Sequence, residues 1–297
     1  MNFSEDFFKE EIRSDYLVTS KMKKVWAAQL NMLKLLDDIC KRHNIKYFVE
    51  YGTLLGAVRH KGYIPWDDDL DIMMFRDDYE RFKQIAAEEI KEPYFFQNIY
   101  TESGMIWAFS KIRDSRTSAI EFPDVPAEQF NQGIFIDIFP FDDAPDEINM
   151  KSAVRDIQRD LWRTLVRPME LLNAINNGEK LACDADIIVD MISLPAHERM
   201  REFETFNASL FGKSSRINFI TSEMYHLEAS RERKWYDEIV WLPFENTMVP
   251  APAGYEEVLK CQYGDYMKPV KGGTWHEGIY LDPDTPYYIT LKDKLIK

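Results

Sequence analysis

The chain shows two kinds of apolar spacing, one with the period of a helix and one with the period of a strand. Apolar residues recur near helical spacing over 21–43, while charged residues occupy the other faces. The short apolar run at 70–75 has the length of a strand and lies downstream of Pro65. The first half of the chain predicts helices at 21–43 and from Asp77 or Asp78 to just before Pro93, and strands at 45–49, 70–75, 95–100, 105–114 and 133–140.

The second half changes from helical to extended spacing. Residues 145–211 are mainly helical, and proline-containing segments that resemble paired edge strands follow. The pattern predicts a helix that ends near Pro168, a turn at 176–178, a helix that starts at Pro195, strands at 217–220, 235–245 and 248–252, and an exposed loop at 117–131.

Composition narrows the class of protein. With 297 residues, 45% of them hydrophobic and 14% aromatic, the chain has enough apolar material for a packed core. The formal net charge of −14 argues against nucleic acid as a partner, because nucleic-acid binders normally carry a basic face. Three widely spaced cysteines indicate reduced thiols. Without a signal peptide or an apolar run of roughly 20 residues, we expect a cytoplasmic protein.

The stretch at 51–75 combines a glycine-containing turn, basic residues and four aspartates. Strand side chains alternate between faces, so Asp69 and Asp71 should point the same way, with Cα atoms about 6.6 Å apart. Two such carboxylates can share a divalent cation, which offsets the cost of like charges beside an apolar strand. Asp68 should face away from Asp69, and we assign Asp67 and Asp68 a supporting role. A solvated acidic loop or a helix cap is the alternative.

The residues before the aspartates make the pattern more specific. The glycine and threonine at 52–53 suit a strand-to-helix turn whose N–H groups can face a phosphate. A glycine turn and then an Asp-Leu-Asp strand resembles the nucleotidyltransferase superfamily. The whole string at 52–71 resembles the signature of the LicD family of phosphotransferases, which is related to the fukutin group. Strings at 133–140 and 235–267 resemble further blocks, so the likeness extends over about 20–270, with a weakly matched middle.

The resemblance implies an α+β fold, with a nucleotidyltransferase-like mixed β-sheet flanked by helices and a mainly helical insertion. We expect a catalytic core at 1–143, the insertion at 144–215, and a C-terminal part at 216–297 that completes the same catalytic domain. The insertion shows no chemical motif, and its charges suit solvated faces. A role in acceptor choice or oligomerisation is the functional alternative, and the sequence does not indicate the oligomeric state.

The resemblance also implies a third acidic residue. Asp137 interrupts an otherwise apolar strand, the position that the third acidic residue occupies in the superfamily. Asp69, Asp71 and Asp137 are therefore the expected catalytic and metal-binding residues, holding Mg²⁺, with Mn²⁺ as a substitute. Asp137 would complete the metal site or take the proton of the acceptor hydroxyl. The alternative is a buried aspartate satisfied by a backbone donor or a nearby arginine.

Phosphate groups need donors and positive charges near the metal. Lys111 and Arg113 share one face of their strand, and Arg59 can bind phosphate in a bidentate way. For His276, an incidental loop histidine is the alternative. The expected substrate-binding residues are Gly52, Thr53, Arg59, Lys61, Trp66, Lys111, Arg113 and His276. A donor that carries choline would need an aromatic cage, for which Tyr63, Trp66, Trp107 and Trp275 are available.

The resemblance implies transfer of a phosphoalcohol, first of all phosphocholine, from a CDP-alcohol donor such as CDP-choline to a sugar hydroxyl, with release of CMP. The acceptor would be a cell-surface glycan precursor or a lipid-linked sugar, such as teichoic acid repeats or lipopolysaccharide. It would be modified at the inner face of the cytoplasmic membrane, with at most peripheral attachment of the enzyme. Two alternatives stay open: a true nucleotidyltransferase that moves NMP from an NTP to a hydroxyl, and a catalytically silent scaffold that binds nucleotide or glycan.

Overall fold

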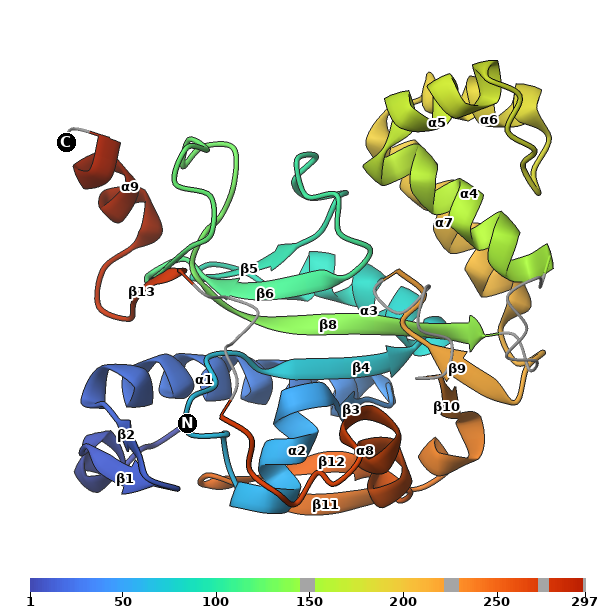
Figure 1. The fold of residues 1–297 in the computed structure, drawn as a ribbon. Coiled ribbons are helices and arrows are strands. Elements are labelled where there is room, and N and C mark those ends of the chain that lie inside the picture. The colour runs from blue at the N-terminus through green and yellow to red at the C-terminus, as the bar shows by residue number, and fades with distance from the viewer. Residues whose placement is uncertain (145–152, 222–229, 272–277, 296–297) are drawn as a thin grey trace.

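The computed structural model describes residues 1–144, 153–221, 230–271 and 278–295. Figure 1 shows a mixed sheet with helices on both sides and a further group of helices beyond one end of it. The fold is α+β, as the sequence predicts. The helices are α1 (Ser20–His43), α2 (Tyr51–His60), α3 (Arg76–Glu89), α4 (Ala153–Val166), α5 (Pro168–Asn176), α6 (Ala185–Ile192), α7 (Ala196–Leu210), α8 (Tyr255–Tyr263) and α9 (Tyr287–Leu295), with 3₁₀ turns at Glu5–Phe8 and Arg233–Tyr236.

Strand β8 (Ile134–Ala144) is the centre of the main sheet. It pairs in parallel with β4 on one side and antiparallel with β6 and β9 on the other. Its run of apolar residues is buried because α1 and α3 both pack against it. The other strands are β1 (Glu11–Arg13), β2 (Tyr16–Val18), β3 (Phe48–Val49), β4 (Asp71–Phe75), β5 (Tyr94–Gln97), β6 (Ser110–Asp114), β7 (Ser118–Ile120), β9 (Arg216–Asn218), β10 (Arg231–Glu232), β11 (Ile239–Phe244), β12 (Thr247–Pro252) and β13 (Tyr280–Asp282).

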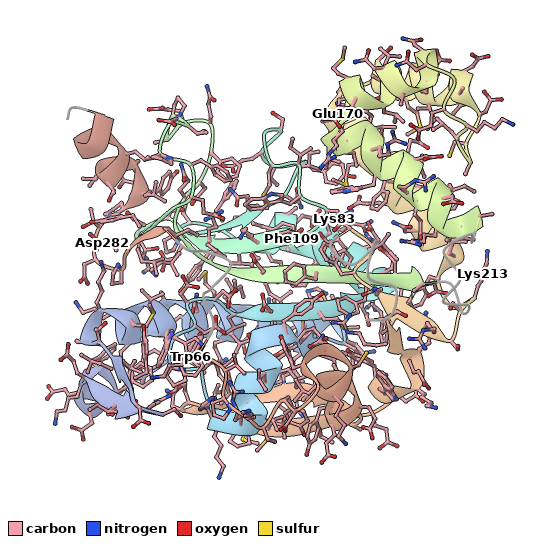
Figure 2. The ribbon with its side chains drawn as sticks, viewed as in Figure 1. Trp66, Lys83, Phe109, Glu170, Lys213 and Asp282 are labelled. Atoms are coloured by element: carbon pink, nitrogen blue, oxygen red, sulfur yellow. The ribbon has the colours of Figure 1, made fainter. Side chains whose placement is uncertain are left out.

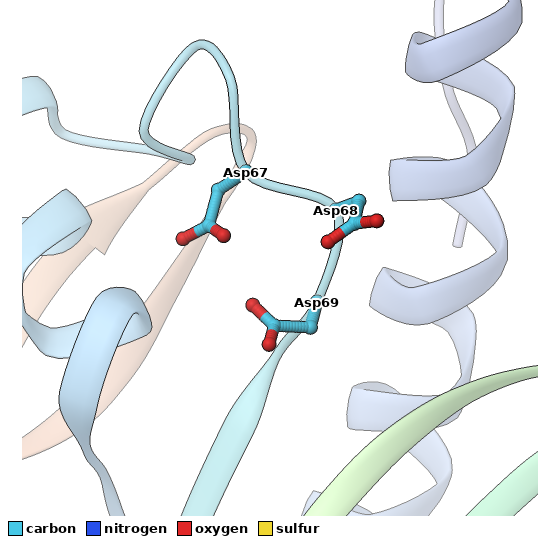
Figure 3. A group of neighbouring side chains, drawn as sticks. All are labelled: Asp67, Asp68 and Asp69. Carbon is cyan, nitrogen blue, oxygen red and sulfur yellow. The ribbon is translucent and has the colours of Figure 1, made fainter. Parts of the chain in front are cut away.

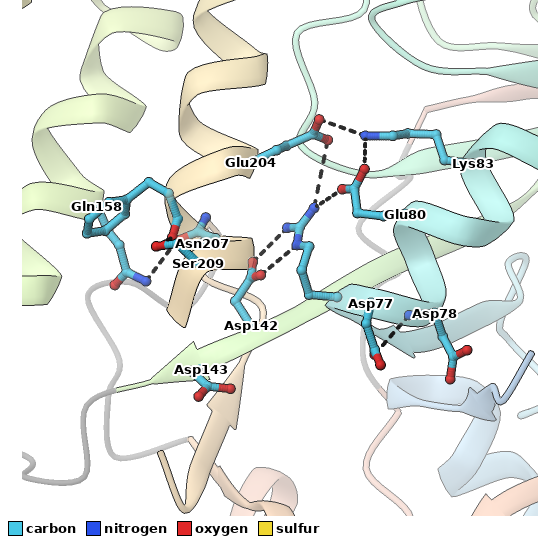
Figure 4. A network of polar contacts seen from close by, with 12 residues as sticks. Asp77, Asp78, Glu80, Lys83, Asp142, Asp143, Gln158, Glu204, Asn207 and Ser209 are labelled. Carbon is cyan, nitrogen blue, oxygen red and sulfur yellow. Dashed lines mark hydrogen bonds and ion pairs between the residues drawn. The ribbon is translucent and has the colours of Figure 1, made fainter. Parts of the chain in front are cut away.

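Helix α1 follows directly from its sequence. The Thr19 hydroxyl accepts the Met22 N–H at the start, and Asn44 adopts the left-handed conformation (φ 51°) that ends many helices. The prediction that Asp77 or Asp78 caps α3 is wrong, because the helix begins at Arg76. The two aspartates make other contacts: the Asp77 carboxylate accepts the Asp78 N–H (Figure 4). The Asp78 carboxylate accepts the Lys46 N–H.

Two other expectations are corrected in the middle of the chain. Residues 105–109 do not extend strand β6, which covers only Ser110–Asp114. The expected loop at 117–131 contains strand β7, which pairs antiparallel with β13 near the C-terminus. The hairpin of β11 and β12 forms as predicted, although its strands contain prolines.

The four helices α4 to α7 lie between β8 and β9 in the chain and pack against one another beyond the end of the sheet, as the helical pattern predicts (Figure 1). Glu204 on α7 joins this group to the core. Its carboxylate lies 2.7 Å from Lys83 Nζ and 3.8 Å from Arg76 Nη1 (Figure 4). Arg76 in turn binds both oxygens of Asp142 on β8, at 2.6 and 2.7 Å. The division of the chain into domains stays a prediction.

The C-terminal part returns to the main sheet and to α2. Strand β9 pairs with β8, β10 pairs with β9, and helix α8 packs against α2. Within the described part of the chain, no helix combines the length and the apolar character needed to cross a bilayer.

Candidate active site

Three neighbouring strands place one side chain each in a row. Asp71 begins β4, and its Cα partner on the parallel strand β8 is Asp137. The Cα partner of Asp137 on the antiparallel strand β6 is Lys111. Because opposed residues of neighbouring strands point to the same face, these three side chains lie next to one another, on strands about 4.8 Å apart. All three are buried, so the row is a charged site inside the fold.

The aspartates before β4 form a second group beside this row. Residues 67–70 are not part of any strand, and one oxygen from each of Asp67, Asp68 and Asp69 lies within 4.8 Å of the other two (Figure 3). The expectation that Asp68 faces away from Asp69 is therefore wrong, because strand alternation begins only at Asp71. Among the described residues, these three aspartates are the group of possible metal ligands whose oxygens all lie within 4.8 Å of one another. The expected set of Asp69, Asp71 and Asp137 does not have that spacing.

The two acidic groups influence each other. The pKa of Asp71 lies well above its ordinary value because the side chain is buried, and the charges of Asp69, Asp137 and Asp67 raise it further. Burial likewise raises the pKa of Asp67 to about 6, and the charge of Asp68 adds to the effect. The charge of Lys111 opposes these effects at Asp71.

The donor set fits a hard divalent cation. Carboxylate oxygens are the preferred ligands of Mg²⁺, and a cation would remove the repulsion that raises the pKa of Asp71. Asp137 Oδ1 is a buried oxygen without a hydrogen bond, although the ammonium group of Lys111 lies 2.9 Å away as an ion-pair partner. Such an oxygen can accept a ligand or a proton. Asp67, Asp68 and Asp69 are therefore candidate metal ligands, with Asp71 and Asp137 beside them, and the identity of the metal stays a prediction.

Helix α2 presents its first turn to the acidic groups. Thr53 Oγ1 accepts the backbone N–H of Asp71 at 2.8 Å, which ties the helix to the start of β4. Gly52 packs so closely on Asp67 that an added Cβ would lie closer than 3.0 Å to the Asp67 carboxylate. Gly52 and Thr53 therefore position the aspartates, and their expected contact with phosphate stays a prediction.

Lys111 is the basic member of the row. It is 1% exposed, and its Nζ lies 3.9 Å from Glu121 as well as 2.9 Å from Asp137. Arg113, expected beside it, is held by the fold instead. Its guanidinium donates to Gln97 Oε1 at 2.5 Å, to the Gly133 carbonyl at 2.9 Å and to Glu121 Oε2 at 2.5 Å. Of the two residues, Lys111 is therefore the better candidate to face a phosphate, and that contact stays a prediction.

The other expected substrate-binding residues lie farther along α2 and its loop. Arg59 is in the last turn of α2, roughly 9 Å along the helix axis from Thr53, and donates to the Tyr266 carbonyl at 2.9 Å. Lys61 is exposed at the end of the helix. Trp66 is half-buried against Tyr16 and His60. His276 lies outside the described residues. The structure thus brings Gly52, Thr53 and Lys111 to the carboxylates, and it places Arg59, Lys61 and Trp66 at the margin.

Half-buried rings border the row of charged residues. Trp107 stacks on Phe109 with centroids 5.4 Å apart, and Phe109 packs on Phe139 at 4.7 Å. Figure 2 labels Phe109 at the main sheet. Tyr51 meets Phe139 edge to face at 5.5 Å. Of the expected cage residues, Trp107 belongs to this group and Trp275 lies outside the described residues. Tyr63 is buried and stacks on Trp26 with centroids 4.6 Å apart, so it is a core residue.

Two polar groups of α1 at the site were missed from the sequence. Trp26 Nε1 donates to the Asp67 carbonyl at 3.2 Å, and Gln29 Nε2 donates to the Asp68 carbonyl at 2.7 Å. Helical spacing identified Trp26 only as a packing residue. A buried glutamine on an otherwise apolar helix face is a sign of a specific acceptor, because an unpaired amide is costly to bury.

Comparison with known proteins covers the part of the chain that forms this site. Residues 44–177 match the nucleotidyltransferase domain of the LicD/FKTN/FKRP family. The lipopolysaccharide cholinephosphotransferase LicD of Haemophilus influenzae is 27% identical over 245 residues, which cover 80% of this chain and 88% of that protein. The ribitol 5-phosphate transferase FKRP is 27% identical over 97 residues in Mus musculus and 33% identical over 63 residues in Homo sapiens. These matches cover 33% and 21% of this chain and 17% and 12% of the FKRP proteins.

The matched residues include α2, the acidic segment and both strands that carry Asp71 and Asp137. The fold and the site thus define a nucleotidyltransferase-type domain. Residues 44–177 resemble this domain of the LicD/FKTN/FKRP family, as the string at 52–71 indicates, and these comparisons support a transferase.

Proposed function

We propose that the protein is a divalent-metal-dependent phosphotransferase that moves a phosphoalcohol from a CDP-alcohol donor to a sugar hydroxyl of a glycan precursor and releases CMP. Phosphocholine is the first candidate for the transferred group. The observation that carries the proposal is the row of Asp71, Asp137 and Lys111 beside the acidic segment, in a chain similar to a lipopolysaccharide cholinephosphotransferase over most of its length. The proposed site of action is the cytoplasm, at the inner face of the membrane.

Phosphoryl transfer requires mainly positioning and charge compensation. Carboxylates of the acidic segment at Asp67, Asp68 and Asp69, with Asp71 or Asp137 beside them, would hold the metal, most simply Mg²⁺, which would compensate negative charge on the donor's pyrophosphate. Lys111 supplies a fixed positive charge beside Asp137. Its ammonium group is held against the Phe135 ring, with Nζ 3.4 Å from the centroid, so it is preorganised to face developing charge.

In the proposed reaction, the acceptor hydroxyl oxygen attacks the phosphorus that carries the alcohol. The bond from this phosphorus to the bridging oxygen of the pyrophosphate breaks, and CMP leaves with the electron pair. The hydroxyl proton would pass to Asp137 or, where Asp137 completes the metal site, to solvent. Attack on the nucleotide phosphorus would instead transfer the nucleotide, so the bond that breaks distinguishes the proposal from a true nucleotidyltransferase.

The half-buried rings favour choline over an uncharged polyol. A quaternary ammonium ion is attracted to aromatic faces, and Trp107, Phe109, Phe139 and Tyr51 surround one side of the charged row. The same rings can stack on the cytosine base. Comparing donors that differ only in the alcohol separates these two uses.

The test is CMP release from CDP-choline, CDP-ribitol and CDP-glycerol with Mg²⁺ and a sugar acceptor. We expect turnover with at least one donor and its loss in Asp69→Asn and Asp71→Asn. Asp77→Asn, at an exposed position of α3, is the matched control and should keep full activity. Transfer of a nucleotide from CTP or ATP, without consumption of any CDP-alcohol, would overturn the donor assignment. Binding of nucleotide or glycan without metal-dependent turnover would indicate a scaffold.

A further inference from the structure

The acidic segment is held from outside the sheet. Residues 67–70 lie before β4, so the ladder of hydrogen bonds between strands does not fix most of their backbone. Helix α1 supplies the missing donors through two side chains. Trp26 Nε1 binds the Asp67 carbonyl at 3.2 Å, and Gln29 Nε2 binds the Asp68 carbonyl at 2.7 Å. The position of the acidic segment therefore depends on α1.

Gln29 makes a second contact, with strand β8, which carries Asp137. Its Nε2 also lies 3.3 Å from the carbonyl oxygen of Phe135, to which it donates. Phe135 is on β8, two residues before Asp137. A side-chain amide carries two N–H donors, so the Gln29 amide can bind both the Asp68 carbonyl and the Phe135 carbonyl. The side chain is 1% exposed, and water does not compete for these bonds.

The orientation of this amide is dictated by its surroundings. Gln29 Oε1 is buried and has no hydrogen-bond partner. An unpaired buried oxygen is unfavourable, but turning the amide over would bring Oε1 against the two carbonyl oxygens that Nε2 now binds. The bridge between Asp68 and Phe135 therefore outweighs the unpaired oxygen.

We propose that Gln29 is a positioning residue that sets the distance between the acidic segment 67–69 and Asp137 by bridging the carbonyl groups of Asp68 and Phe135. The proposal rests on the proposed function in treating these carboxylates as one site. Groups that orient metal ligands typically change metal affinity by roughly 10- to 100-fold when they are removed. Loss of the bridge should therefore weaken Mg²⁺ binding without removing a carboxylate.

The experiment compares Gln29→Met and Gln29→Glu with Gln158→Met. Methionine keeps the length of the side chain and removes its donors, and glutamate places a carboxylate oxygen against the two carbonyls. Gln158 is a matched control, since it is also 1% exposed on a helix and donates one side-chain hydrogen bond, to Asn207 Oδ1 at 2.9 Å (Figure 4). It lies in the helical insertion, on α4.

Three readouts are measured on the full chain: the melting temperature, the Mg²⁺ dissociation constant from calorimetric titration, and amide hydrogen exchange of the peptide 64–75. We expect all variants to lower the melting temperature. Both Gln29 variants should also weaken Mg²⁺ binding by roughly 10-fold or more and speed exchange in 64–75. Gln158→Met should change neither the Mg²⁺ dissociation constant nor the exchange of peptide 64–75.

A Gln29→Met protein with unchanged Mg²⁺ affinity and unchanged exchange in 64–75 would overturn the proposal and leave Gln29 as a packing residue. These readouts do not use a donor substrate. A wild-type protein that binds Mg²⁺ but consumes no CDP-alcohol would refute the proposed function, while the Gln29 variants would still decide the positioning role. If the wild-type protein binds no Mg²⁺, faster exchange confined to 64–75 supports the bridge, and its absence refutes it.

Discussion

Replacing Lys111 by methionine should destabilise the protein more than replacing its partner Asp137 by asparagine. Lys111 Nζ lies 2.9 Å from Asp137 Oδ1, and the side chains are 1% and 6% exposed. At this distance, with an effective dielectric constant of about 20, their attraction is about 6 kcal/mol before desolvation is counted. Removal of one partner of a buried pair typically costs about 3–5 kcal/mol, because the other charge stays buried without compensation.

The two substitutions differ in what they leave behind. Lys111→Met leaves Asp137 beside the like charge of Asp71, so we expect it to lower the free energy of unfolding by the full 3–5 kcal/mol or so. Asp137→Asn removes one of the mutually repelling charges, and Lys111 keeps Glu121 Oε1 at 3.9 Å. We expect a loss of about 1–3 kcal/mol, the range for a disturbed buried polar contact.

Urea unfolding at pH 7, with EDTA and then with Mg²⁺, measures both effects. Because bound cation stabilises only the folded state and can replace the lost charge, Mg²⁺ should recover part of the Lys111→Met loss. Lys83→Met is the control. Lys83 also pairs with two carboxylates, Glu80 and Glu204, but in the network of α3 and α7. A smaller loss for Lys111→Met than for Asp137→Asn, or equal recovery of Lys83→Met by Mg²⁺, would refute this reasoning.

Two further predictions concern α2. Gly56→Ala should lower the free energy of unfolding by about 1–3 kcal/mol, because the added Cβ would lie closer than 3.0 Å to the Gly62 carbonyl oxygen. Gly104→Ala is the control and should not be destabilising, because no atom lies within 4 Å of its added Cβ; parallel urea titrations compare the two variants. Burial, and after it the charge of Arg59, lowers the pKa of His60 to about 4. Because the unfolded histidine has a pKa of about 6.5, unfolding takes up a proton between pH about 4 and 6.5. The free energy of unfolding therefore falls as the pH falls through this window. His60→Asn should reduce the difference in melting temperature between pH 5 and 8, and an unchanged difference would contradict the assignment.

Long periodic elements of the fold were predictable because their local pattern and their burial agree. The limits of α1 followed from its apolar face and from Asn44, and β8 followed from its apolar run. Strand β7 was not predictable. It has three residues, too few for a period, and its partner β13 lies far along the chain. The start of α3 was misplaced because Asp77 and Asp78 have the composition of caps but bind other N–H groups.

The candidate site was likewise predictable only in part. Asp71, Asp137 and Lys111 could be singled out because each lies in a recognisable strand, whereas the register that aligns them comes from the pairing of β4, β8 and β6. The arrangement of Asp67, Asp68 and Asp69 does not follow, because no strand period applies before Asp71. Contacts from a distant helix fix these residues, and a local pattern does not contain such contacts.

The string at 52–71 has a meaning in packing as well as in chemistry. The sequence predicts that Gly52 and Thr53 donate hydrogen bonds to phosphate. In the structure each glycine of the string is also a point of close approach: Gly52 meets Asp67, Gly56 meets the carbonyl of Gly62, and Gly62 meets the carboxylate of Glu245. A side chain at Gly52 or Gly56 would push α2 away from the segment that leads to the aspartates, and a side chain at Gly62 would displace the Glu245 carboxylate. The glycines therefore place the acidic residues even where they touch no ligand, and substitutions there should alter stability and activity together.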